Sequence, residues 1–253
     1  MLSAVQNIPN LRPPHERCAE CPIRFQAVCS YCGPDELAML DAIKFYRNYE
    51  PGQEIVAAGE ETGFLGSVVE GVVSLSKTML DGRRQTVGLM FASDFVGRPM
   101  RPIAPYDAVA VTPVKLCMFT RSRFERILRE YPALEKRLLE MTLDELDAAR
   151  DWMLLLGRKT AKEKIASFLA ILVRRAAALE RRTPGDGFSF TLPLTREAIA
   201  DYLGLTIETV SRQITALKKA GIIELSTARN CHVPDYLALL DAAGEDADGG
   251  MID

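Results

Sequence analysis

The chain has 253 residues, of which 48% are hydrophobic and 26% are charged, a composition typical of a folded globular protein. These values exclude a fully disordered chain. They also exclude a membrane protein, because the most apolar run, Trp152–Leu156, is far too short to cross a bilayer. The N-terminus has no apolar run behind a basic start, so we expect no signal peptide and a cytoplasmic location.

The net charge of −3 is unevenly distributed along the chain. Residues 158–234 contain 13 basic and 7 acidic residues, whereas residues 235–253 contain six acidic residues and no basic ones. Residues 1–157 are mildly acidic. A basic module of this size indicates a nucleic-acid-binding unit in the second half of the chain.

Four of the six cysteines lie close together near the N-terminus, in a Pro-containing segment without a clear hydrophobic period. They are Cys18, Cys21, Cys29 and Cys32, while Cys117 and Cys231 stand apart. In a reducing cytosol, clustered thiols more often bind metal or take part in redox chemistry than form disulfides. One arrangement is a zinc knuckle built from the two Cys-x2-Cys pairs, although the loop between the pairs is short for it.

The next region changes from helical to strand-like patterning. Residues 34–46 are expected to form a short helix with Leu40 and Ile43 on one face. From residue 48 to about residue 119, short apolar runs alternate with turn residues roughly every ten positions, which indicates an antiparallel sandwich or barrel. Asp81-Gly82 predicts a hairpin with a tight primed turn, because such a turn requires positive φ.

Two helices are expected next, over residues 121–131 and from Pro132 to about Leu156. The longer one carries apolar residues at alternating spacings of three and four, the seam that pairs helices in a coiled coil. The seam consists of Leu139, Thr142, Leu146, Ala149, Met153 and Leu156. A helix packed on its own domain would also explain this pattern, but we favour a dimerisation helix.

The basic module contains the most specific pattern in the chain. After a helix over residues 161–179 and two short strands within residues 181–193, a helix is expected over residues 196–203, capped by Thr195. Gly204 supplies a tight turn, and Thr206 caps a second helix that runs to about Ala220. Two short helices joined through a glycine turn are typical of a helix-turn-helix.

The second of these helices divides into two faces. Val210, Ile214 and Leu217 would pack on the first helix, and the opposite face is polar. Arg pairs with guanine and Glu with cytosine in the major groove, while Lys contacts phosphates. The candidate DNA-binding residues are Thr206, Glu208, Ser211, Arg212, Thr215 and Lys218. A hairpin formed by residues 222–225 and 231–233 would complete a winged helix.

The chain resembles the CRP/FNR superfamily of bacterial transcription regulators over nearly its full length. The segment LTIETVSRQI is similar to the FNR branch, whose DNA-reading residues follow a Glu-x-x-Ser-Arg pattern, here Glu208, Ser211 and Arg212. The resemblance implies an α+β fold with an antiparallel β-roll like a cyclic-nucleotide-binding jelly roll, a long dimerisation helix and a C-terminal winged helix-turn-helix. It further implies a homodimer on a TTGAT-like inverted repeat, and contact between the Asp81-Gly82 hairpin tip and RNA polymerase.

The resemblance also implies an oxygen-labile [4Fe-4S] cluster, for which iron–sulfur chemistry requires four thiolates. The matching ligands are Cys18, Cys21, Cys29 and Cys117. Their Cys-x2-Cys-x7-Cys spacing looks like the FnrL/FnrN subgroup, whereas other FNR proteins have five residues in the second gap. A cluster that uses Cys32 in place of Cys29 and the zinc knuckle remain open.

A cyclic nucleotide is a less suitable ligand for this chain. Arg98 stands where the nucleotide cassette of related receptors has Glu, and no Arg-Ser/Thr pair precedes Ala108. No paired carboxylates, Ser/His/Asp set or phosphate loop stands out, so we expect no enzyme. The principal hypothesis is an oxygen-responsive activator of anaerobic genes whose intact cluster supports DNA binding. The alternative is a family member without a cluster that responds to a small molecule or carries structural zinc.

These patterns predict five regions. They are a cysteine-rich cluster-binding segment (1–34), a β-roll sensor (35–131), a dimerisation helix (132–157), a winged helix-turn-helix domain (158–236) and a solvated, disordered acidic tail (237–253).

Overall fold

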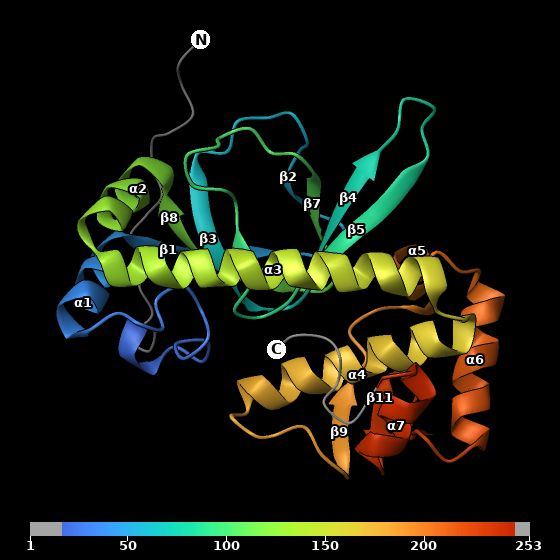
Figure 1. Ribbon diagram of the computed structural model, residues 1–253. Helices are drawn as coiled ribbons and strands as arrows, with labels where there is room; N and C mark the ends of the chain where they lie inside the picture. Colours follow the sequence, from blue (N-terminus) through green and yellow to red (C-terminus); the bar gives the residue numbers. More distant parts are fainter. Residues whose placement is uncertain (1–16, 246–253) are drawn as a thin grey trace.

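The computed structural model describes residues 17–245, which form a β-roll and a helical C-terminal domain joined by one long helix (Figure 1). The first part of the cysteine-rich segment, residues 1–16, and the end of the expected acidic tail, residues 246–253, lie outside the described residues. The architecture confirms the expected α+β fold with a β-roll and a winged helix-turn-helix.

Two four-stranded antiparallel sheets form the β-roll, with strand orders β1-β8-β3-β6 and β2-β7-β4-β5. Alternate residues of both sheets face inward and bury an apolar core that includes Val68, Leu116 and Met118. The strands are β1 (Lys44–Tyr49), β2 (Glu54–Val56), β3 (Phe64–Glu70), β4 (Val73–Thr78), β5 (Arg84–Met90), β6 (Phe95–Val96), β7 (Asp107–Ala110) and β8 (Val114–Thr120).

The segment before the β-roll begins with a short 3-10 helix, η1 (Cys18–Glu20), and ends in α1 (Pro34–Ile43). The expectation that α1 continues to Tyr46 is wrong, because β1 starts at Lys44 and pairs with β8 along its whole length. Phe45 and Tyr46 are good strand formers, and the sheet supplies hydrogen-bond partners that a helix end would lack.

The hairpin between β4 and β5 forms where it was predicted, but its turn differs from the predicted one. The Gly82 N–H donates to Met79 O at 3.0 Å, and the Met79 N–H donates to Arg83 O at 2.8 Å. Gly82 has φ of +84°, whereas Asp81 is not among the residues with positive φ. The connection is therefore a longer turn with one left-handed glycine, and not a two-residue primed turn.

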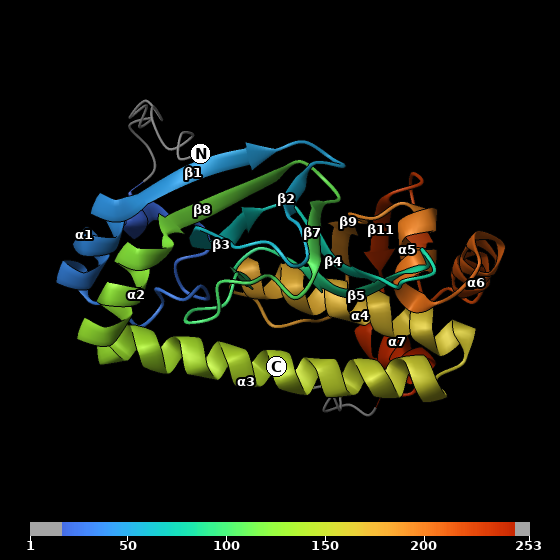
Figure 2. The same cartoon turned by 90° about the horizontal axis from the view of Figure 1, so that it is seen from above.

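The two expected helices after the β-roll are present as α2 (Arg121–Glu130) and α3 (Pro132–Arg158). Helix α3 spans 27 residues and runs from the α1–α2 end of the molecule to the helix-turn-helix end (Figure 2). Near its C-terminal end, the Trp152 ring stacks on the Tyr202 ring with centroids 3.9 Å apart. The long helix is thus packed directly against the C-terminal domain.

The C-terminal domain follows the predicted order of helices closely. It contains α4 (Ala161–Leu179), β9 (Phe188–Thr191), α5 (Arg196–Leu203), α6 (Ile207–Lys219), β10 (Glu224–Leu225), β11 (Asn230–Val233) and α7 (Tyr236–Ala243). The order β10-β11-β9 gives a three-stranded antiparallel wing sheet. Only one strand forms within residues 181–193, so the expectation of two is wrong. The polar stretch before Phe188 lacks apolar side chains to bury.

The expectation of a solvated tail from residue 237 is wrong for the part that the structure describes. Residues 236–243 form α7, which buries Tyr236, Leu239 and Leu240 in the C-terminal core. The Asp235 side chain accepts the Ala238 N–H and caps the helix. The prediction relied on the acidic composition of this region and did not consider the helical spacing of its apolar residues.

Candidate DNA-binding surface and cysteine site

Helices α5 and α6 form the helix-turn-helix. The Thr195 and Thr206 hydroxyl oxygens accept the N–H groups of Ala198 and Thr209 and cap the two helices. Gly204 ends α5 with φ of +63°, a conformation that glycine adopts without the strain of a side chain. Val210, Ile214 and Leu217 are buried, so the opposite face of α6 must point outward.

The polar face of α6 is exposed to solvent, and the structure brings its predicted residues together. The exposed set comprises Thr206, Glu208, Ser211, Arg212, Thr215 and Lys218. Thr206 already uses its hydroxyl as a cap, which leaves it less free to read DNA. Bonds from the Glu208 backbone N–H and the Thr206 hydroxyl hold the pKa of Glu208 below its ordinary value, so Glu208 is an ionised acceptor. Their DNA-contacting roles stay predictions.

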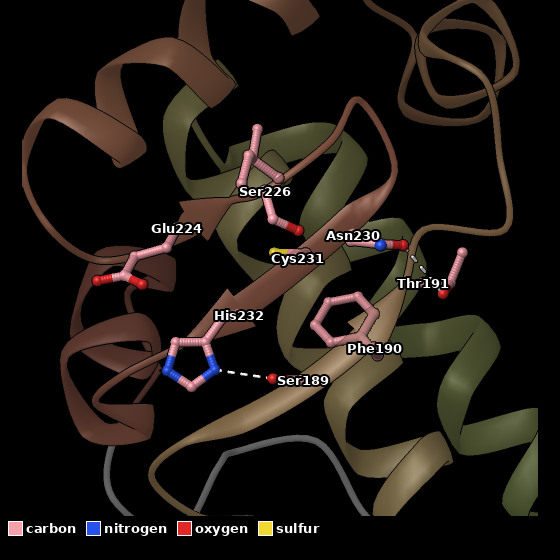
Figure 3. A pocket seen from close by; sticks show the side chains of 9 residues that line it. Ser189, Phe190, Thr191, Glu224, Ser226, Asn230, Cys231 and His232 are labelled. Atoms are coloured by element: carbon pink, nitrogen blue, oxygen red, sulfur yellow. Dashed lines mark hydrogen bonds between the residues drawn. The ribbon is translucent and has the colours of Figure 1, made fainter.

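The wing sheet carries a hollow of about 450 Å³ on its polar side (Figure 3). Ser189 Oγ lies 2.8 Å from His232 Nδ1, and Thr191 Oγ1 donates to Asn230 Oδ1 at 3.4 Å. These are cross-strand pairs on adjacent strands, and they satisfy one another within the sheet. The hollow therefore has the character of a sheet surface and does not enclose a ligand.

An apolar stripe on α3 is uncovered in the single chain. The exposed fractions are 59% for Leu139, 47% for Leu146 and 65% for Met153. Ala149 is also exposed, whereas Leu156 packs against the C-terminal core. Four of the five predicted dimerisation residues are thus available to a second helix, and Leu156 is largely committed to its own chain.

The cysteine-rich segment packs against α1 and strand β8, so that thiols distant in sequence meet. Cys117 projects from β8 into an apolar cluster that contains Val28, Leu65 and Phe119, with Cys29 packed against it. All six cysteines are free thiols. Arg24 fixes the local loop by donating to the carbonyl oxygens of Cys29 and Cys32 at 2.9 and 2.8 Å.

The thiols influence one another electrostatically. Burial and, to a smaller extent, the neighbouring thiols Cys21 and Cys18 raise the pKa of Cys29 to about 12. Burial also raises the pKa of Cys117, with added contributions from Cys18, Cys21 and Cys29. Burial raises the pKa of Cys18 and Cys21 as well. Neighbouring thiols of this kind are costly to ionise in the free protein. A bound cation or metal cluster would stabilise the thiolates, so the group is suited to bind one.

Cys32 lies in the same apolar cluster as Cys29, but its main charged neighbour is Glu36 and not another thiol. Its side chain is buried with Val28 and Leu40, and burial raises its pKa to about 11, with Glu36 as the next cause. The thiols that act on Cys117 are Cys18, Cys21 and Cys29. Within residues 17–245, no group of three or more His, Cys, Asp or Glu side chains is spaced to hold a metal ion. The donor set fits an iron–sulfur cluster in chemistry and location, but the thiols would have to draw closer together.

Two polar side chains beside the thiols were missed from the sequence. Lys44 Nζ donates to Cys18 Sγ at 3.4 Å and lies 2.8 Å from Asp41 Oδ1. Ser67 lies across from Cys117 in the pairing of β3 with β8. Nothing in the sequence near these residues indicates a site, because contacts between segments distant in sequence bring them to the thiols.

Two arginines of the region that corresponds to a nucleotide cassette form hydrogen bonds within the chain. Arg98 Nη2 donates to Ile103 O at 2.9 Å, and Arg121 Nη1 donates to Arg98 O at 2.8 Å. Arg121 also pairs with Glu125 at 3.0 Å. These contacts tie the β6–β7 loop to α2 and give Arg98 a structural role.

Comparison with known proteins agrees with this architecture. The cyclic nucleotide-binding domain model matches residues 46–131, and the Crp-like helix-turn-helix domain model matches residues 163–242. The chain is 56% identical to the transcriptional activator protein FnrL of Cereibacter sphaeroides, over 93% of this chain and 95% of that protein. It is 45% identical to a probable transcriptional activator of Rhizobium leguminosarum bv. viciae, over 86% and 89%.

A solved structure extends the comparison to three dimensions. FixK2 from Bradyrhizobium japonicum is 32% identical and superposes with a TM-score of 0.71, covering 81% of this chain and 100% of that one. Fold and matched domains define a transcription regulator with a cyclic nucleotide-binding-like β-roll, a long connecting helix and a Crp-like helix-turn-helix domain. The chain belongs to the CRP/FNR family, which consists of transcription regulators and not enzymes. No described helix has the length and apolar character needed to span a membrane.

Proposed function

We propose that this chain is an oxygen-responsive transcriptional activator that holds a [4Fe-4S] cluster through Cys18, Cys21, Cys29 and Cys117. The observation that carries the proposal is the convergence of three N-terminal thiols with a fourth on β8, nearly a hundred residues later in the chain. The electrostatic contacts of Cys117 favour Cys29 over Cys32 as the third ligand. When bound, the cluster supplies an oxygen-sensitive link between the N-terminal segment and the β-roll.

The cysteine segment also contacts the first turns of the dimerisation helix. Arg137 Nη2 of α3 donates to Gln26 O at 2.8 Å, and the Arg137 guanidinium lies 5.7 Å from the centre of the Tyr31 ring. Leu134 of α3 is buried in the same apolar cluster as Val28. A rearrangement of the segment would therefore reach α3 directly, and through α3 the pairing of two chains.

If two chains pair along α3, their two α6 helices can each read one half of a palindromic DNA site. The cysteine segment and α6 lie at opposite ends of the molecule in both views (Figures 1 and 2), and α3 runs between these ends, which makes it one route for the signal. We propose a homodimer that reads a TTGAT-like inverted repeat with half-sites one DNA turn apart. The partly polar seam suits this switch, because a few kcal/mol decide between mostly monomer and mostly dimer.

The tip of the β4–β5 hairpin is proposed to contact RNA polymerase. Leu80 is fully exposed there, and Arg83 Nε is held by Asp81 Oδ2 at 2.8 Å. Substitution of Arg83 is expected to lower activated transcription in vitro while operator binding stays unchanged. A parallel loss of DNA binding would show that the hairpin is structural.

Anaerobic purification tests the proposed function. The expected product is a brown protein with about four iron atoms per chain. Cys29→Ala should lose the iron, whereas Cys32→Ala, the matched control from the same loop, should retain it. A colourless anaerobic preparation with one zinc per chain would contradict the proposal and favour the zinc knuckle. If Cys29→Ala retains iron and Cys32→Ala loses it, the third ligand is Cys32 and not Cys29.

A further inference from the structure

The face of the β1-β8-β3 sheet that carries Cys117 also carries a buried serine. Ser67 of β3 is directly opposite Cys117 of β8, and cross-strand partners project from the same face of a sheet. Ser67 is 2% exposed, and its hydroxyl has no hydrogen-bond partner among the described residues. A buried hydroxyl without a partner costs stability, so its presence opposite Cys117 points to a ligand that binds there and accepts its hydrogen bond.

A buried cation flanks the thiols from the other side. The Lys44 side chain is 5% exposed, and its Nζ contacts both Asp41 Oδ1 and Cys18 Sγ. Lys44 also lies over the Tyr46 ring at 5.2 Å, and Tyr46 is the β1 partner of Cys117. Cys117 is therefore bordered by Tyr46 on β1 and by Ser67 on β3, while Lys44 reaches Cys18.

We propose that Lys44 and Ser67 are positioning residues that donate hydrogen bonds to sulfur atoms of the iron–sulfur cluster and so set its resistance to oxidation. This inference rests on the proposed function. Hydrogen bonds and positive charge near cluster sulfurs stabilise the more electron-rich state, which raises the reduction potential. Asp41 holds the Lys44 ammonium in place, and the Ser67 hydroxyl can rotate toward an acceptor.

A structural role alone would predict different behaviour. If Lys44 only paired with Asp41 and Ser67 only filled space, their loss would lower stability without changing the cluster. Ser67→Ala removes a single oxygen atom and keeps the small volume of the side chain. Lys44→Met removes the charge and keeps the length, and Lys44→Arg restores a donor.

The test uses the full-length protein loaded anaerobically with iron and sulfide. Iron content is measured first, followed by the half-life of the visible absorbance in air and the midpoint potential. Ser67→Ala and Lys44→Met should load iron like the wild type but lose absorbance roughly two- to tenfold faster, the factor that one ordinary hydrogen bond provides. Their potentials should be more negative, and Lys44→Arg should recover most of the half-life.

Two matched controls separate this effect from general destabilisation. Ser76→Ala removes a buried hydroxyl from the other sheet, where it accepts Arg84 Nε at 2.8 Å. Arg47→Met removes a positive charge from the same strand as Lys44, over the Tyr49 ring at 4.9 Å. Both controls should keep the wild-type half-life and potential.

The failures of the two proposals are distinguishable. Wild-type half-life and potential in Ser67→Ala and Lys44→Met would overturn the inference and leave the cluster itself intact. Absence of iron from the wild type would contradict the proposed function, and the inference with it. If Lys44→Met does not fold by circular dichroism, Ser67→Ala decides the question alone.

Discussion

Arg175 of α4 donates to Asp94, in the turn between β5 and β6, with 2.7 Å between Nη1 and Oδ1. The second Asp94 oxygen accepts the Phe91 N–H at 2.8 Å, and the Arg175 guanidinium lies 5.8 Å from the centre of the Phe91 ring. Phe91 and Val72 of the β-roll are buried in the same apolar cluster as the core of the C-terminal domain. The β-roll and the C-terminal domain therefore share a packed interface within one chain.

A double-mutant cycle with Arg175→Met and Asp94→Asn should show a favourable coupling. We expect about 0.2–1 kcal/mol in the free energy of unfolding, because the Arg175 side chain is 43% exposed and solvent screens the pair. Urea unfolding of the wild type, both single variants and the double variant measures it. Strictly additive effects would show that the contact does not couple the domains.

Locally encoded features of the fold were predictable, and features set by distant contacts were not. Helices α4 and α5 begin at the predicted residues because Thr160 and Thr195 supply strong N-caps. The start of β1 depends on pairing with β8, which local patterning does not reveal. The candidate ligands followed from spacing and resemblance, whereas strand register brings Ser67 to Cys117, and the packing of η1 against the end of α1 brings Lys44 to Cys18.

Arg212→Ala and Lys218→Ala should weaken DNA binding in different ways. Arg212 lies on the exposed face of α6 with a weak contact to Thr209 Oγ1 at 3.4 Å, so it is free to reach a base. Its loss should reduce discrimination at a guanine of the half-site by about 1–3 kcal/mol. Lys218→Ala should weaken binding to all sequences and lower the salt dependence. Titration of cognate and mismatched duplexes distinguishes the two, and equal loss on random DNA would assign Arg212 to phosphate.

Leu146→Asp should prevent dimerisation. Leu146 is central in the exposed stripe of α3 and 47% exposed in the single chain, so pairing would bury an unpaired carboxylate there. Leu154→Asp is the matched control, since Leu154 is 58% exposed on the same helix but outside the seam. Light scattering of the anaerobic protein should give the monomer mass for Leu146→Asp only. A dimer in both variants would place the interface elsewhere.

The metal-free protein should lose stability as the pH rises above about 9. Burial raises the pKa of Cys29 from its ordinary value of 9.0 to about 12 in the folded state. Between these values the unfolded thiol releases its proton and the folded thiol keeps it, so ionisation stabilises the unfolded state. Urea midpoints at pH 8 and 10 should therefore fall less for Cys29→Ala than for the wild type. An equal fall in both proteins would mean that Cys29 keeps its ordinary pKa when folded.

The last described residue closes a buried ion cluster at the junction of α3 and α4. Glu245 accepts Lys159 Nζ at 2.9 Å and Arg174 Nη1 at 3.3 Å, and its side chain is 4% exposed. Lys159 Nζ also donates to the buried Ser167 hydroxyl at 2.6 Å. Glu245, just beyond α7, is thus tied to the elbow, the junction between α3 and α4 at Lys159, where the chain enters the C-terminal domain.

Glu245→Ala should lower the free energy of unfolding by about 3 kcal/mol, because it leaves two mostly buried cations without their carboxylate. Glu180→Ala is the control, since Glu180 and its partner Arg182 are 52% and 58% exposed and should contribute less than about 1 kcal/mol. Urea unfolding of the three proteins gives both values. If Glu245→Ala unfolds like Glu180→Ala, the cluster does not secure the elbow, and the packing of Leu239 and Leu240 on α4 must hold α7 by itself.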